Sequence, residues 1–119
     1  MGTGFQNLQV WKDAMALTVE TYKATDRLRD PALRDQIRRA AVSVPSNIAE
    51  GDERDTDRDS VRFFYIAKGS LAELRTQLEI AQEVGLLPAE RVHSIQQHAI
   101  VVGRRLGALI KARSATYER

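Results

Sequence analysis

The sequence predicts an all-α protein, an antiparallel up-down-up-down four-helix bundle with a proline-kinked second helix, as one domain over residues 1–119. Apolar residues recur every three or four positions through four long segments, which is the period of an amphipathic helix. Short turn signals separate these segments, and short connections favour antiparallel neighbours. No segment has the alternating pattern of a β-strand.

The first helix is expected at about residues 8–28, with Asn7 as its N-cap. Its apolar residues form two stripes, whereas a surface helix of a monomer needs to bury only one. We therefore expect one stripe to pack within the bundle and the other against a neighbouring chain. The first stripe is Leu8, Trp11, Met15, Val19 and Tyr22, and the second is Val10, Ala14, Leu17 and Leu28.

The second helix, expected at about residues 31–50, carries a proline in the middle of its apolar pattern. Asp30 and Pro31 supply an N-cap and a first helical residue. Pro45 has no N–H to donate to the carbonyl of Ala41, four residues earlier, and this predicts a kink.

A polar stripe runs beside the apolar face of this second helix. Two interpretations stay open: a simple boundary between core and solvent, or a buried stripe that satisfies the free carbonyl and fixes how helices or subunits register. Gly51 follows the stripe and is expected to end the helix in the left-handed conformation. The stripe consists of Gln36, Ser43, Asn47 and Glu50, with Arg39 at its outer edge.

The third helix is expected at about residues 57–84 and the fourth at about residues 88–114. Ile66 and Ile80 lie off the core face of the third helix and add to the apolar surface available for assembly. Gly69 stands in the middle of that helix, where glycine costs about 1 kcal/mol relative to alanine. The close approach of another backbone is the expected compensation.

Three blocks of the chain, in this order, resemble a known family. They are FQNLQVWKDAMAL at 5–17, QIRRAAVSVPSNIAEG at 36–51 and RFFYIAKGSLAEL at 62–74. The chain resembles the 23S rRNA-intervening sequence proteins, which are small bacterial four-helix-bundle proteins. This resemblance implies a cytosolic homopentamer, and a similarity to the retroelement accessory variability proteins, which bind nucleic acid and a reverse transcriptase. Arg75 departs from the family pattern, in which an acidic residue is common after Leu74.

The composition is that of an ordinary globular domain, with 43% hydrophobic and 29% charged residues, so disorder is not expected. The absence of cysteine excludes disulfides and thiolate metal sites. No apolar run approaches the roughly 20 residues of a membrane span, and a cytoplasmic protein is expected. The net charge of +2 does not by itself indicate a nucleic-acid partner.

Enzymatic chemistry finds little support in the sequence. His93 and His98 are five residues apart, whereas metal ligands on one helix face stand three or four apart. Glu50 has no acid–base partner at a matching distance, and we expect it to pair with an arginine. Because no phosphate-cradling glycine loop or nucleophile motif is present, the protein is predicted to be non-enzymatic and to need no cofactor or metal.

Basic clusters on the second and fourth helices leave two functions open. In one, an oligomer of this chain repeats the clusters and binds RNA, or works with a nucleic-acid enzyme, through backbone contacts without base stacking. In the other, nearby carboxylates such as those of residues 52–59 neutralise the clusters, and the chain is an oligomeric protein–protein interaction scaffold that binds no nucleic acid. The candidate cations are Arg34, Arg38, Arg104, Arg105, Lys111 and Arg113.

Overall fold

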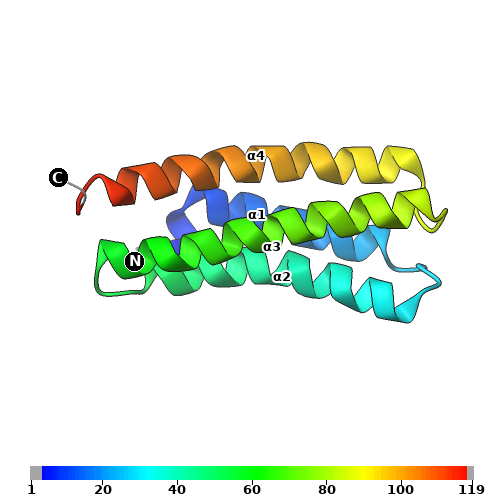
Figure 1. The fold of residues 1–119 in the computed structure, drawn as a ribbon, viewed down its shortest axis with the longest axis horizontal. Helices are drawn as coiled ribbons and strands as arrows, with labels where there is room; N and C mark the ends of the chain where they lie inside the picture. Colours follow the sequence, from blue (N-terminus) through cyan, green and yellow to red (C-terminus); the bar gives the residue numbers. More distant parts are fainter. Residues whose placement is uncertain (1–3, 118–119) are drawn as a thin grey trace.

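The computed structural model describes residues 4–117, and these contain four long helices and no strand. Each helix runs back alongside the one before it, and the bundle is 48 Å long (Figure 1). The contacts join α1 to α2, α2 to α3, α3 to α4 and α4 to α1, so α2 and α4 occupy opposite corners. Residues 1–3 and 118–119 of the predicted domain lie outside the described part. The helices are α1 (Gln9–Ala24), α2 (Pro31–Asp52), α3 (Asp57–Glu83) and α4 (Ala89–Ser114), preceded by the short 3-10 helix η1 (Phe5–Asn7).

Two of the helix starts are set by side-chain caps. The side chains of Asp30 and Thr56 each accept a hydrogen bond from the backbone N–H three residues later, at 3.0 Å and 3.1 Å. Asn7, the expected cap of α1, lies instead in η1, and Leu8 precedes α1 without any side-chain cap. The extra turn of η1 explains this error, because it moves the start of α1 past Asn7.

A glycine in the left-handed conformation ends α3, as the position of Gly85 in the sequence indicates. Its φ angle is +78°, and the next N–H, of Leu86, donates to the carbonyl of Ala81 at 2.8 Å. This is the Schellman arrangement, which satisfies carbonyls that the helix end would otherwise leave free.

Gly51 differs from its predicted role, and the predicted close contact at Gly69 is not made within the described part of this chain. Gly51 does not end α2, which continues to Asp52, and its φ angle is not positive. A Cβ atom at Gly51 would lie 2.7 Å from Cε1 of Phe64 and 2.9 Å from the carbonyl oxygen of Ser60, so α2 and α3 approach closely here. A Cβ at Gly69 would meet nothing within 4 Å, so no backbone among residues 4–117 approaches it, and an approach by another chain stays a prediction.

All four helices contribute to one hydrophobic core. Leu17 of α1, Ile37 of α2, Phe64 of α3 and Ile95 of α4 are fully buried in it. Burying a large apolar side chain contributes roughly 1.5–3 kcal/mol, so this core is the main source of stability.

Pro45 lies inside α2, which is helical on both sides of it. The carbonyl of Ala41, which this proline leaves without its usual donor, accepts a hydrogen bond from Oγ1 of Thr18 on α1 at 3.1 Å. The same hydroxyl lies 2.8 Å from the carbonyl of Ala14. One interpretation of the sequence predicts that the polar stripe of α2 satisfies the carbonyl of Ala41. This prediction is wrong, because the donor is Thr18 of α1. The kink at Pro45 stays a prediction.

The polar stripe does link α2 to α3. Oγ of Ser43 lies 2.8 Å from Oγ of Ser70, and Nδ2 of Asn47 donates to the carbonyl and Oγ of Ser43 at 2.8 Å and 2.9 Å. Glu50 is exposed and pairs with Arg54 at 3.1 Å, which is the expected pairing with an arginine. The half-buried part of the stripe therefore fixes the register of two helices.

Candidate nucleic-acid interface

Two of the predicted cations on α4 are held by carboxylates of their own chain. Nη2 of Arg113 lies 2.6 Å from Oδ1 of Asp52, and its guanidinium also lies 5.5 Å from the centre of the Phe64 ring. Arg105 forms an ion pair with Asp13 of α1. These two arginines tie α4 to α2 and α1, and their assignment to phosphate binding stays a prediction.

Arg38 is also occupied within the bundle. Its Nε donates to Oγ1 of Thr25 at 3.0 Å, its Nη2 donates to the carbonyl of Tyr22 at 3.1 Å, and its guanidinium lies 4.4 Å from the centre of the Tyr22 ring. It thus satisfies a carbonyl at the end of α1, which the sequence of α2 alone does not reveal. Arg34, one turn earlier, lies 3.6 Å from Asp35 in an exposed pair that contributes little.

Arg104 and Lys111 form no ion pair with any described residue, and both lie on the side of α4 that borders α3. Lys111 lines a hollow of about 490 Å³ between the two helices, together with Tyr65 and Lys68 of α3. Arg104 lies seven residues before Lys111, close to two full turns, and therefore on the same face. Lys68 has no carboxylate partner among the described residues either.

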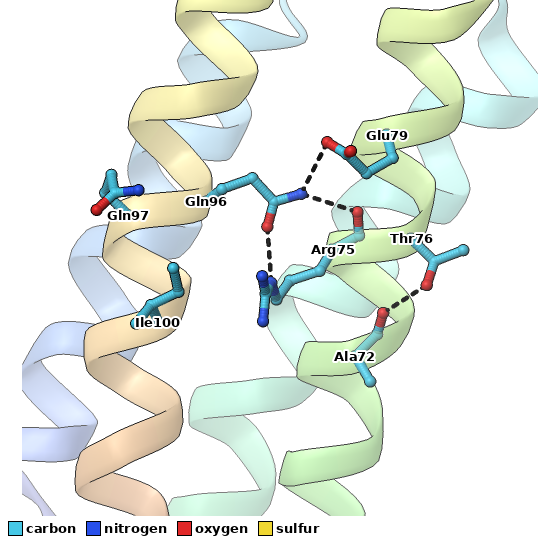
Figure 2. Close-up of a pocket in the computed structure, with 7 residues that line it drawn as sticks. All are labelled: Ala72, Arg75, Thr76, Glu79, Gln96, Gln97 and Ile100. Carbon is cyan, nitrogen blue, oxygen red and sulfur yellow. Dashed lines mark hydrogen bonds between the residues drawn. The ribbon is translucent and has the colours of Figure 1, made fainter.

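A second hollow lies between α3 and α4, nearer the turn that joins them (Figure 2). Oε1 of Gln96 accepts a hydrogen bond from Nε of Arg75 at 2.7 Å, and its Nε2 donates to the carbonyl of Arg75 at 3.0 Å and to Glu79 at 3.3 Å. The direct partner of the Arg75 guanidinium is thus a neutral amide, and its charge remains available. This second hollow, of about 500 Å³, is lined by Ala72, Arg75, Thr76, Glu79, Gln96, Gln97 and Ile100.

Lys68, Arg75 and Lys111 line the two hollows between α3 and α4, and Arg104 shares the face of α4 that carries Lys111. Lys68 and Arg75 are seven residues apart on α3, and Arg104 and Lys111 are seven apart on α4, so the members of each pair are separated by about 10.5 Å along the helix. Glu79, at the end near the turn, is the one carboxylate among the residues that line the two hollows. We call this strip the α3–α4 basic groove.

The sequence analysis found Arg104 and Lys111 but missed Lys68, Arg75 and the aromatic ring of Tyr65. On α3 these side chains are isolated among neutral and acidic neighbours, and no cluster draws attention to them. Their spacing of seven places Lys68 and Arg75 on one face, which was an available signal. Only the packed bundle shows that this face of α3 lies beside α4.

A serine, a histidine and a glutamate meet between α1 and α4, but not in a catalytic order. Oγ of Ser94 donates to Oε2 of Glu20 at 2.7 Å, and Nδ1 of His98 lies 2.6 Å from Oε1 of the same carboxylate. A serine nucleophile activated by histidine donates its hydrogen bond to the imidazole, whereas here the serine hydroxyl and the imidazole both contact the carboxylate of Glu20. Residues 4–117 also hold no group of side chains that could bind a metal ion.

Exposed apolar side chains are found on α1, α2 and α3. Ile66 and Ile80 of α3 are 50% and 45% exposed, as expected from their positions off the core. The stripe of α1 that contains Val10 is buried, while the stripe that contains Met15 stays largely open and borders an apolar hollow of about 370 Å³ beside α2. We call the following residues the apolar surface: Met15, Val19, Val42, Ile66 and Ile80.

The architecture is that of a small all-α protein, a four-helix bundle with a basic groove between α3 and α4 and exposed apolar side chains on α1, α2 and α3. No helix within residues 4–117 combines the length and hydrophobicity that a membrane span requires. Residues 6–108 match the model of the family described as 23S rRNA-intervening sequence protein, and the chain belongs to that family.

A crystal structure with the same fold comes from Bacteroides thetaiotaomicron. It is a protein of unknown function from the S23 ribosomal protein family, with a TM-score of 0.80 and 22% sequence identity. The alignment covers 86% of this chain and 98% of that one. Comparison with curated proteins gives no match.

Proposed function

We propose that this protein is a non-enzymatic homo-oligomer that binds the phosphate backbone of nucleic acid through the α3–α4 basic groove. The observation that carries the proposal is that Lys68, Arg75 and Lys111 line the hollows between α3 and α4, with Arg104 on the same face of α4 as Lys111, and that none of the four pairs with a carboxylate of residues 4–117. Unpaired cations of this kind neutralise phosphates and release the counterions that surround nucleic acid. By contrast, the arginines that pair with carboxylates of the same chain act in folding.

Oligomerisation strengthens this function, because each added chain repeats the groove. Several weak phosphate contacts on one assembly give an avidity that a single groove lacks. Support for assembly comes from the apolar surface, whose side chains are between 40% and 50% exposed in the single chain. The family resemblance favours five chains and a cytoplasmic location.

Arg39 is exposed, with no ion-pair partner among the described residues, and we retain it as a candidate contact between chains.

An oligomeric scaffold that binds no nucleic acid is the second candidate. The same apolar surface favours it, as does the modest net charge of +2. In that case the basic groove would serve only to keep the assembly soluble. The two candidates agree on self-association and differ on whether the groove has a ligand.

Filter binding of labelled single-stranded RNA at several salt concentrations separates the two candidates. Each phosphate contact contributes about −0.7 to the slope of log affinity against log salt for a single strand, so four cations predict a slope of about −3 for one groove. Lys68→Ala with Lys111→Ala should weaken binding and flatten the slope by about 1.4. Lys12→Ala with Lys23→Ala, which removes two exposed lysines of α1, is the matched control. Binding that is absent, or lost equally in both variants, would favour the scaffold.

A further inference from the structure

We propose that the α3–α4 basic groove takes a single nucleic-acid strand rather than a duplex, with one base stacked on the ring of Tyr65. This inference rests on the proposed function and names its class of ligand. It goes beyond the sequence pattern, in which no aromatic residue stands among the clustered cations.

Tyr65 has the position and the exposure that base stacking needs. It lines the same hollow as Lys68 and Lys111, and it is 55% exposed. The ammonium of Lys68 lies 5.9 Å from the centre of its ring, so a phosphate held by this lysine would have its base beside the ring. Stacking on an aromatic ring next to cations is the usual way in which proteins bind single strands without sequence preference.

A glycine across the groove leaves room for the base. Gly107 of α4 lines the same hollow as Tyr65, and a Cβ atom built there would meet nothing within 4 Å. Most other residues at position 107 would project a side chain into this space. The hollow beside Tyr65 therefore has room at Gly107 for a planar group that enters from solvent.

The shape of the groove fits one strand better than two. Neighbouring helices in a bundle pack about 8–10 Å apart, and the groove between α3 and α4 can follow only one backbone. The bases of a duplex are stacked on one another and offer no free face to Tyr65, unless a base leaves the stack at a cost. A single strand carries no such cost.

The charges limit the length of strand that one groove can hold. The distance of about 10.5 Å between Lys68 and Arg75 corresponds to about three nucleotides at a stacked rise of 3.4 Å. Beyond Arg75, the carboxylate of Glu79 lines the groove and repels a further phosphate. One chain should therefore contact a short segment, and longer strands should bind several chains of an oligomer.

Fluorescence anisotropy with a labelled 12-nucleotide single-stranded RNA and the matching 12-base-pair duplex tests this inference. The wild-type protein should bind the single strand more tightly. Tyr65→Ala should weaken single-strand binding by about 5- to 100-fold and duplex binding much less. Because the ring carries no charge, the salt slope should not change. Tyr65→Phe keeps the ring and is the control, expected to bind like wild type.

The failure of this inference is distinguishable from the failure of the proposed function. If Tyr65→Ala binds the single strand as wild type does, or if the duplex binds as tightly as the single strand, the stacking inference is overturned while salt-dependent backbone binding stands. If the wild-type protein binds neither RNA, the proposed function itself is wrong. A thermal melt of Tyr65→Ala that matches wild type would show that any loss of affinity is not a folding defect.

Discussion

Any side chain at position 51 would clash with α3. A Cβ atom there would lie 2.9 Å from the backbone oxygen of Ser60, which cannot swing aside as a flexible side chain could. We expect Gly51→Ala to lower the free energy of unfolding by about 1–3 kcal/mol, measured by urea denaturation. Gly107→Ala, at an open helical site, is the control and should raise it by up to about 1 kcal/mol. Equal stability of Gly51→Ala and wild type would contradict the close packing of α2 and α3.

Thr18 has a hydroxyl that serves two helices. Thr18→Val keeps the shape of the side chain but leaves the carbonyl of Ala41 without a donor, because Pro45 cannot supply one. The expected loss is about 1–3 kcal/mol in the free energy of unfolding. Thr76→Val is the control, because the hydroxyl of Thr76 is exposed and donates only to the carbonyl of Ala72 in the same helix. The free energy of unfolding of this variant should change by no more than about 0.5 kcal/mol. Similar losses in the two variants would show that the bond to α2 contributes nothing.

At this scale, local signals could be predicted and contacts between helices could not. The cap at Asp30 depends on a residue three positions away, and the structure confirms it. The close packing at Gly51 depends instead on Phe64, and the partner of the Ala41 carbonyl comes from α1. No spacing within α2 contains that information.

Among the helices, the pairing of Arg113 with Asp52 ties opposite corners of the bundle. The two side chains are only 25% and 12% exposed, so solvent screens their interaction less than that of a surface pair. A double-mutant cycle with Arg113→Ala and Asp52→Ala should give a coupling energy of about 0.5–3 kcal/mol. The exposed pair of Arg54 and Glu50 should give less than about 0.5 kcal/mol. A coupling no larger than that of this exposed pair would rule out a structural role for Arg113.

Helix positions follow from periodicity, whereas the roles of charged residues follow from how the helices are rotated. The predicted ranges agree with the observed helices to within about four residues at each end, because the apolar period is local. Arg38 and Arg105 seemed available because their partners belong to other helices, whereas the pairing of Arg113 with Asp52 is the neutralisation by residues 52–59 that the sequence left open. The contribution of α3 to the basic groove was missed for the same reason.

In the whole molecule, the apolar surface and the basic groove consist of different residues, and α3 contributes to both. Size-exclusion chromatography with light scattering should give a mass several times 13.4 kDa, with five chains favoured. Ile66→Ser with Ile80→Ser should lower that mass, since both side chains are about half exposed in the single chain. Val101→Ser, on α4, removes an exposed apolar side chain outside this surface and is the control. A wild-type monomer would contradict the assembly proposal.

The most direct test of the central claim is one column experiment that reports mass and bound RNA together. Each protein is mixed with labelled single-stranded RNA, and light scattering and label are followed in the eluted peak. Lys68→Ala with Lys111→Ala is expected to keep the wild-type mass of the protein assembly but to carry much less RNA, because the groove loses half of its cations. If this variant carries as much RNA as wild type, the α3–α4 basic groove is not the nucleic-acid interface.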